Sequence, residues 1–232
     1  AFVPFTCSRD SFAANEEPVH TVTLDSFLMD QTEVTNGMYA RCVADGACTP
    51  PGNRISYSRD SYYGDPAYMD YPVINVDKHQ AAAYCAWAER ELPTEAQWEY
   101  AARGGLAGAL YPWGNTFDGS LANFCDLTCG IIISNPNFND GYPDTAPVGS
   151  YPANGFGLYD MAGNVEEWVV DWYGPYPSGP VENPSGPTSG DYWLFRGGSW
   201  YSHGDKLRVS SRFGDYEDGT YYSLGFRCAL SP

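Results

Sequence analysis

Two segments near the C-terminus, residues 201–206 and 213–223, concentrate the side-chain types that proteins use to bind ligands. Both are rich in Tyr, Asp, Gly and Ser. Tyrosine provides a large, rigid contact surface at low entropic cost, and Ser, Gly and Asp provide adaptable hydrogen bonds, as in antibody paratopes. A pair of ordinary polar surface loops has a similar composition. The contact residues expected for a protein or glycan ligand are Tyr201, Ser202, His203, Asp205, Lys206, Phe213, Asp215, Tyr216, Glu217, Asp218, Thr220, Tyr221 and Tyr222.

The segments that flank these loops have the pattern of a scaffold. Residues 196–200 (RGGSW), 207–212 (LRVSSR) and 224–228 (LGFRC) combine apolar alternation, glycine punctuation and a cysteine. This alternation predicts a rigid frame that presents two loops, so that the binding region covers about residues 195–230.

The net charge of −17, from 12 basic and 29 acidic residues, limits the partners of the chain. Such a surface repels phosphate backbones and anionic lipid, so nucleic acid and membrane surfaces are poor partners, whereas divalent cations are favoured. No apolar run approaches the ~18 residues of a membrane-spanning helix, and no membrane insertion is expected. Within the loops, the acidic side chains predict a ligand with a basic patch. They are Asp205, Asp215, Glu217 and Asp218.

Seven cysteines allow several pairings. The short-range candidates, which would each close a small loop, are Cys42 with Cys48 and Cys125 with Cys129, the long-range candidates are Cys85 and Cys228, and Cys7 is left over. The short pairs lack zinc-ribbon spacing, and no histidine follows at a ligand distance. Disulfides would favour an oxidising compartment.

The elements that position these residues are predicted to be short. Only 18% of residues are charged, and 25 Gly and 18 Pro indicate a loop-rich fold of one large domain or two small ones, not a helix bundle. Helices are predicted over 35–46, 77–91 and 94–104, the last with a capping box between Thr94 and Gln97. Strands are predicted over 20–27 and 166–172, the second with one aromatic face formed by Trp168, Val170 and Trp172.

Seven motifs, spread in order over nearly the whole chain, resemble the sulfatase-modifying-factor superfamily, the formylglycine-generating-enzyme type of the C-type-lectin fold. They are EVTN (33–36), YCAW (84–87), LPTEAQWEYAARG (92–104), TAPV (145–148), GNVEEW (163–168), RGGS (196–199) and GFRC (225–228). The resemblance implies a single α+β domain over residues 1–232, loop-rich, with two main helices and short antiparallel strands. It also implies a disulfide between Cys85 and Cys228.

Activity does not follow from the fold. In the oxidase of this superfamily two thiolates hold Cu(I), and the resemblance places them at Ser202 and Leu207, which supply no soft sulfur ligand. Iron-dependent relatives use histidines of an additional domain, whereas this chain has only His20, His79 and His203. We therefore expect that the chain is not an enzyme, and a formylglycine-generating-like oxidoreductase is the disfavoured alternative.

Structural calcium is the cofactor that the resemblance implies, because calcium takes six to eight oxygens from carboxylates, amides and backbone carbonyls. The two sites would lie at Asn123, Phe124, Asp140 and Tyr142, and at Asp160, Gly163, Val165 and Glu167. Side-chain oxygens would come from Asn123, Asp140, Asp160 and Glu167, and the other four residues would contribute backbone carbonyls. The alternative is a set of loop turns and surface carboxylates without a metal.

The C-terminal layout is also similar to the variable proteins of diversity-generating retroelements, which use a lectin-type fold. In those systems adenines in template Asn codons are mutagenised, and the residues of both loops belong to the set that an AAC codon can yield, except Lys206 and Glu217. The resemblance implies a non-catalytic ligand-binding or display protein whose loops form a diversifiable surface. A sensor or structural domain of a kinase-type or other larger protein is the alternative.

Overall fold

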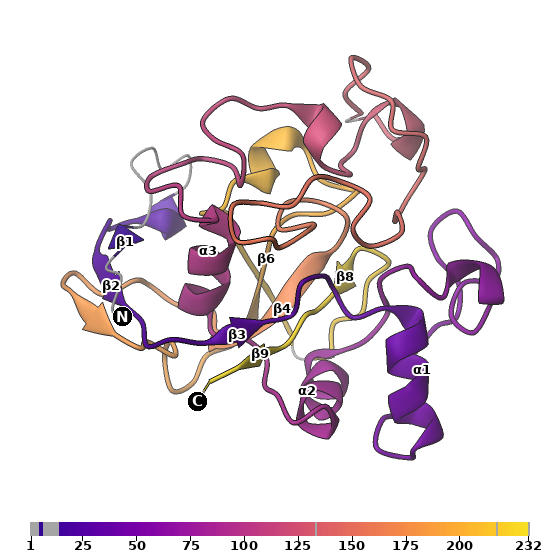
Figure 1. Ribbon diagram of the computed structural model, residues 1–232, viewed down its shortest axis with the longest axis horizontal. Helices are drawn as coiled ribbons and strands as arrows, with labels where there is room; N and C mark the ends of the chain where they lie inside the picture. Colours follow the sequence, from indigo (N-terminus) through magenta and orange to yellow (C-terminus); the bar gives the residue numbers. More distant parts are fainter. Residues whose placement is uncertain (1–4, 7–13, 133, 217, 232) are drawn as a thin grey trace.

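The computed structural model describes residues 5–6, 14–132, 134–216 and 218–231 (Figure 1). Three α-helices, α1 (Asn36–Ala44), α2 (Lys78–Trp87) and α3 (Glu95–Arg103), surround a small central sheet, and most of the remaining chain is loop. The mixed α+β, loop-rich class is confirmed. The expectation of two main helices is an undercount, because α1 is as long as α3.

The helices begin where the sequence predicts them, because capping side chains satisfy the first backbone N–H groups. At α3 the Thr94 hydroxyl accepts from the Gln97 N–H at 3.1 Å and the Gln97 side chain accepts from the Thr94 N–H at 2.8 Å. Gly104 ends this helix in the left-handed conformation, at φ 56°. Asp77 and Gln80 form the same capping box at α2. Both predicted starts are confirmed.

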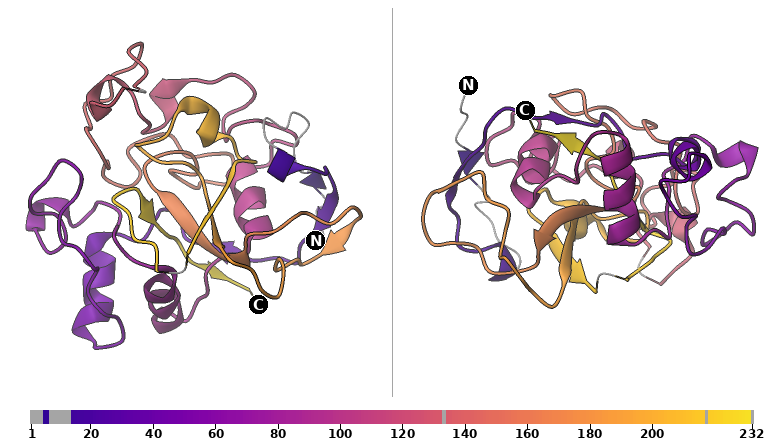
Figure 2. Two further views of the ribbon diagram at one scale, coloured as in Figure 1. Left: turned by 180° about the vertical axis from the view of Figure 1, so that it is seen from behind. Right: turned by 90° about the horizontal axis from the view of Figure 1, so that it is seen from below.

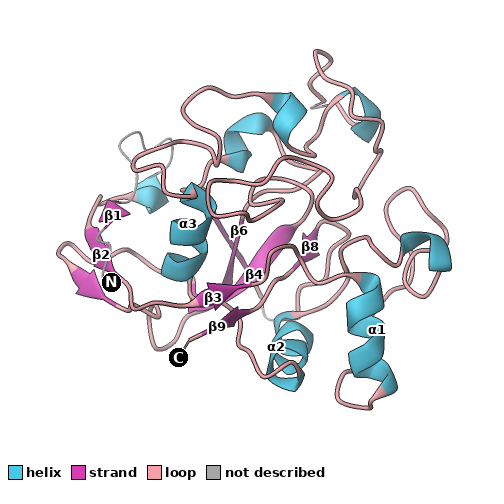
Figure 3. Cartoon of the chain, viewed as in Figure 1, coloured by secondary structure: helices cyan, strands magenta, loops and turns pink. Residues whose placement is uncertain are grey.

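The central sheet has four strands in the order β7-β6-β4-β8, and the loops surround it (Figure 3). They are β4 (Glu166–Trp172), β6 (Trp193–Arg196), β7 (Arg212–Asp215) and β8 (Leu224–Gly225). β6 runs antiparallel to both β4 and β7, but β4 and β8 are parallel. The expectation of only antiparallel strands is therefore wrong at the edge where the chain returns through the second loop.

Two smaller sheets lie beside the central one. β1 (Phe5–Thr6), β2 (Thr21–Thr23) and β5 (Val181–Glu182) form one, and β3 (Leu28–Met29) pairs with β9 (Ala229–Leu230) in the other. The strand predicted over residues 20–27 is thus only three residues long. Its second half, residues 24–27, lies outside any strand, and β3 begins directly after it.

The core lies on both faces of β4, and the views of Figure 2 show helices on either side of this strand. Trp168 packs in a cluster with Tyr84 of α2, whereas Val169 packs with Trp98 of α3. The predicted aromatic face is wrong in detail: Val170 is exposed, whereas Val169 and Asp171 on the other face are buried because α3 covers that face. In α1, Tyr39 and Cys42 form the buried face, and Met38 is exposed.

Three disulfides tie these elements together. They are Cys42–Cys48, Cys85–Cys228 and Cys125–Cys129. The two short pairs were open candidates in the sequence, and the long-range pair is the one that the family resemblance implied. The long-range bond joins α2 to the segment between β8 and β9. Cys7 lies outside the described residues. None of the described helices is both long and apolar enough to span a bilayer.

Candidate ligand-binding surface

Burial along the C-terminal segment follows the boundaries predicted from composition. All residues in 196–200, 207–212 and 224–228 are buried, whereas those described in 201–206 and 213–223 are exposed or half-buried. In the frame, Arg196 ends β6, Arg212 begins β7 and Leu224–Gly225 form β8, while residues 213–215 of the second loop continue β7. The division into scaffold and presented loops is therefore a property of the folded molecule. Glu217, one of the expected contacts, lies outside the described residues.

Four buried arginines hold the frame in place, and each forms an ion pair with a glutamate from elsewhere in the chain. The pairs are Arg196 with Glu99, Arg208 with Glu16, Arg212 with Glu95 and Arg227 with Glu167. A guanidinium buried without a partner is strongly unfavourable, so each pair fixes its segment against a helix, a strand or the N-terminal turn. Sequence periodicity cannot predict these pairs, because each arginine is 60 to 192 residues from its glutamate along the chain.

Exposed tyrosines gather at this surface. Of the chain's 19 tyrosines, only Tyr57, Tyr192, Tyr201, Tyr216 and Tyr221 are largely exposed, at 51%, 41%, 46%, 58% and 44%. Three of them lie in the predicted loops. The other two pack on loop residues: the ring of Tyr57 is 6.3 Å from that of Tyr201, and the ring of Tyr192 is 5.0 Å from that of Tyr216.

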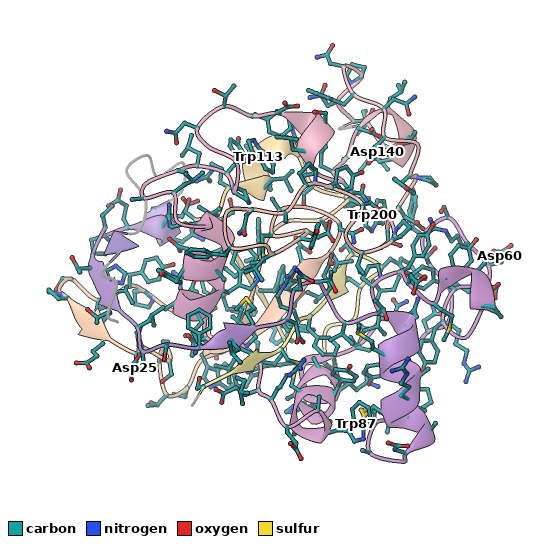
Figure 4. The ribbon with its side chains drawn as sticks, viewed as in Figure 1. Asp25, Asp60, Trp87, Trp113, Asp140 and Trp200 are labelled. Atoms are coloured by element: carbon teal, nitrogen blue, oxygen red, sulfur yellow. A yellow bond between two sulfur atoms is a disulfide. The ribbon has the colours of Figure 1, made fainter. Side chains whose placement is uncertain are left out.

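Tyr57 and Tyr192 are contact candidates that the sequence analysis missed. Tyr57 comes from a long tyrosine-rich loop and Tyr192 from the residues before β6, so only the tertiary fold brings them to the surface. Trp200, buried at the end of the frame, supports this patch (Figure 4). Its ring centroid lies 5.1 Å from Tyr57, and its Nε1 donates to the Tyr222 carbonyl at 3.0 Å.

The other predicted contact residues that the structure describes are either exposed or half-buried. The half-buried ones are Ser202, Phe213, Asp215 and Tyr222. His203, Asp205, Lys206, Asp218 and Thr220 are exposed. Phe213, in contrast, is half-buried and stacks on Phe195 with ring centroids 5.8 Å apart, so it belongs mainly to the frame.

Hydrogen bonds order the second loop. The Tyr221 hydroxyl donates to the Asp215 carboxylate, and this contact raises the pKa of Tyr221 to about 12. Asp215 also accepts from the Tyr216 N–H at 2.7 Å. Asp215 thus orients two of the exposed tyrosines.

The positions that the family resemblance gives to copper thiolates hold no sulfur. Ser202 is half-buried, and its Oγ accepts a hydrogen bond from the Ser199 N–H at 3.1 Å. Leu207 is fully buried in an apolar cluster with Phe124. Every cysteine among the described residues is in a disulfide. These residues therefore do not fit a copper site built from thiolates.

The first predicted calcium region lies against the binding loops. Asn123 and Phe124 are buried, and the Asn123 Oδ1 has no hydrogen-bond partner among the described residues. Asp140 accepts from the Tyr142 N–H at 2.8 Å and the Tyr151 hydroxyl at 2.7 Å, and burial raises its pKa.

Asp126, which the sequence analysis missed, connects this region to the loops. Its carboxylate accepts from the Asp140 N–H at 2.6 Å, and it lies inside the Cys125–Cys129 disulfide loop. The Cys125 N–H in turn donates to the Ser202 carbonyl at 3.0 Å. A cation near Asp140 would therefore also support the first binding loop.

The second predicted calcium region is already occupied by protein charges. Both oxygens of Glu167 accept from Arg227, and Trp98 Nε1 adds a further hydrogen bond at 2.8 Å. Asp160 accepts from the Gly149 N–H at 2.6 Å. In the described part of the chain, no three His, Cys, Asp or Glu side chains converge as a metal cluster. Of the two regions, the Asn123–Asp140 region fits a cation better, since its carboxylates have no arginine partner among the described residues.

The second region also contains two expected backbone positions and one carboxyl group that was not expected. Gly163 and Val165 are backbone positions at the heart of the fold, with Gly163 at φ 85° against the carbonyl of Asn123. Glu33, absent from the expected ligands, contributes a buried carboxyl whose Oε2 has no partner among the described residues. Burial, and next the charge of Asp160, raise the pKa of Glu33.

Comparison with known proteins places this chain in a defined family. Residues 4–232 match the model described as "Sulfatase-modifying factor enzyme 1-like domain". The chain is 36% identical to the Formylglycine-generating enzyme of Streptomyces coelicolor over 94% of this chain and 82% of that protein. It is 42% identical to the mouse Formylglycine-generating enzyme, with 92% and 68% covered.

The chain is also similar to a protein kinase and to a variable protein of known structure. Serine/threonine-protein kinase pkn1 of Chlamydia caviae is 37% identical over 93% of this chain, which spans only 34% of that kinase. Among solved structures, Treponema denticola variable protein 1 superposes with a TM-score of 0.75 at 25% identity, covering 100% of this chain and 95% of the other. The formylglycine-generating-enzyme kind of C-type-lectin fold is thus confirmed.

These relatives correct one expectation. The replacement of the copper thiolates by Ser202 and Leu207 led us to expect a chain that is not an enzyme. That expectation is contradicted, because relatives 36–42% identical are named Formylglycine-generating enzyme. The two replaced side chains remain a local difference within the family. By its sequence match, its relatives and its fold, the chain belongs to the sulfatase-modifying factor enzyme 1-like family.

Proposed function

We propose that the chain binds a protein or glycan ligand through the surface formed by residues 201–206 and 213–223, extended by Tyr57 and Tyr192. The observation that carries this proposal is that three of the five largely exposed tyrosines lie on loops held by a buried frame and the other two pack against them. Aromatic anchors at the centre of an interface usually carry most of the binding energy. The exposed carboxylates Asp205 and Asp218, with the half-buried Asp215, favour a ligand with basic groups.

The proposal is tested with purified protein and glycan arrays. The labelled chain is compared with a Tyr216→Ala/Tyr221→Ala double variant and with Phe156→Ala, which removes an equally exposed ring elsewhere. Any ligand bound by the unmodified chain should bind the double variant at least about tenfold more weakly, and Phe156→Ala normally. Unchanged binding by the double variant would show that this surface is not the binding site.

We further propose that the loops are diversified in nature, as in a variable protein of a diversity-generating retroelement. One support is the structural likeness to Treponema denticola variable protein 1. The other is that the boundaries between buried frame and exposed loops coincide with the boundaries at which the amino-acid composition changes. A frame held by disulfide and ion pairs tolerates changes in exposed loops, since exposed substitutions usually alter stability by less than about 0.5 kcal/mol.

Calcium is proposed as a structural cofactor near Asn123 and Asp140. The buried, unpartnered Oδ1 of Asn123, and the carboxylates of Asp126 and Asp140, which the Asp140 N–H links, are oxygen donors of the kind that calcium prefers. Chelation by EGTA should then lower the melting temperature of the chain but not that of Asp140→Asn. Equal melting curves with EGTA and with added calcium would exclude the site.

A sensor or structural role within a larger protein is the second candidate. It is favoured by the kinase relative, of which this chain spans about a third. Determining the full native reading frame tests this alternative, since a kinase domain in the same frame would support it and a frame ending with this domain would not.

A further inference from the structure

A cavity of about 490 Å³ lies on the side of the molecule where α3 faces the small β1-β2-β5 sheet, at the left of Figure 1. Val22 of β2, Val181 of β5 and Ala96 of α3 contribute apolar surface. Four prolines form much of the remaining wall. They are Pro175, Pro177, Pro184 and Pro187. Small-molecule sites typically have this size and a mostly apolar lining with a few polar groups.

One carboxyl group in the wall has an oxygen that accepts no hydrogen bond from the described residues. Asp171, at the end of β4, is only 3% exposed, and its Oδ2 accepts from the Glu95 N–H at 2.7 Å. Among the described residues, the hydrogen bond to this carboxylate reaches Oδ2 and none reaches Oδ1. Gly186 lies against this oxygen, and a Cβ at that position would stand 2.9 Å from Oδ1. The glycine therefore leaves room beside the free lone pairs.

The cations around Asp171 are engaged with other groups. Arg212 forms a bidentate pair with Glu95 at 2.6 and 2.8 Å, and the Lys78 ammonium donates to the Val170 carbonyl at 2.8 Å. Arg196 and Arg103 pair with Glu99, the remaining acidic group of the wall. Burial, and next the charge of Glu95, raise the pKa of Asp171 to about 7. The charges of Lys78 and Arg212 offset part of this effect, and a ligand cation would add further compensation.

An aromatic wall faces the same space. The Tyr176 ring lies 4.9 Å from that of His20, and the guanidinium of Arg212 covers it at 3.8 Å. The Tyr176 hydroxyl donates to Glu95 at 3.0 Å, which fixes the ring. The wall is therefore rigid before a ligand arrives, so that little ordering cost is added on binding.

We propose that this cavity is a second binding site, for a small molecule with one protonated amine and a compact apolar body. The ammonium donates to Asp171 Oδ1, and the body packs against Tyr176 and the prolines. The net charge of −17 raises the local concentration of such cations. The site is separate from the C-terminal loops, so it does not depend on the function proposed for them.

Benzylamine is the test probe, and benzyl alcohol is its uncharged control of similar size. Binding is followed by ligand-observed and protein-observed NMR at pH 7.5 on the chain as it exists. The geometry predicts one benzylamine per chain, bound at least about tenfold more tightly than benzyl alcohol, because a hydrogen bond to a charged group is the stronger one. Chemical-shift changes should map to α3, residues 174–187 and β5.

Three variants distinguish binding in the cavity from unspecific electrostatic attraction of the amine to the acidic surface. Asp171→Asn keeps the shape and an acceptor for the Glu95 N–H, and it should remove the preference for the amine. Ala96→Leu, on a half-buried helix position of the wall, should block both probes, whereas Ala83→Leu, on the exposed side of α2, should have no effect. The proposal is overturned if benzylamine fails to bind, if both probes bind equally, or if Ala96→Leu leaves benzylamine binding unchanged.

Discussion

The buried ion pair between Glu16 and Arg208 is expected to connect the N-terminal turn to the binding surface. Both Nη atoms of Arg208 donate to the Glu16 carboxylate, at 2.6 and 2.7 Å, and both side chains are almost fully buried. Arg208 Nε also donates to the carbonyl of Asp205, inside the first loop, at 2.9 Å. Loss of the carboxylate would therefore loosen the loop as well as the turn.

Glu16→Gln leaves the guanidinium buried without a counter-charge, which costs about 3–5 kcal/mol. For a chain of this size, 1 kcal/mol shifts the melting temperature by about 2–4 °C, so a fall of roughly 6–20 °C is expected. Because the transfer of a whole ion pair from water is itself unfavourable, the Glu16→Met/Arg208→Met double variant should be close to the unmodified chain in stability.

The assay combines urea unfolding with hydrogen exchange. Unfolding gives the free energies for the single and double variants, and exchange should rise over residues 203–211 in Glu16→Gln before other frame segments respond. A single variant within about 1 kcal/mol of the unmodified chain would refute the assigned role of the pair. So would unchanged exchange in the first loop.

Three further outcomes follow from the same structure. Removing the Cys85–Cys228 disulfide by double alanine substitution should cost about 5 kcal/mol by loop entropy for 143 residues, measured by urea unfolding, and a loss below about 1 kcal/mol would contradict it. Since the pKa of Asp171 is raised to about 7, its contribution to stability is present below pH 4 and lost as pH rises through 7. The unfolding free energy should therefore fall between pH 5 and 8 by at least about 1 kcal/mol more in the unmodified chain than in Asp171→Asn, and parallel profiles would reject this. Gly163→Ala should cost about 2–3 kcal/mol, because a Cβ there meets the Asn123 carbonyl at a positive φ, and calorimetry showing an unchanged melting temperature would disprove that contact.

Local signals in the sequence predicted the helix starts and the loop boundaries well. Thr94 and Asp77 begin helices because each cap is complete within four residues. The break between frame and loops at Leu207 and Leu224 is visible because burial and composition change together there.

Long-range features could not be predicted in the same way. The partners of the buried arginines, the contributions of Tyr57 and Tyr192 and the parallel pairing of β4 with β8 depend on residues that meet only in the fold. The stacking of Phe213 on Phe195 was not predictable either, because an exposed tyrosine and a phenylalanine stacked on the frame look alike in a loop-like sequence.

The central claim is that residues 201–206 and 213–223 form a diversifiable ligand-binding surface on a fixed frame. Sequencing the genomic surroundings of the coding region tests it most directly. The account predicts a reverse transcriptase gene and a near-copy of the final coding segment that differs at adenines beneath these two loops. A locus with neither feature, or a copy whose differences extend across the codons of the buried frame, would contradict it.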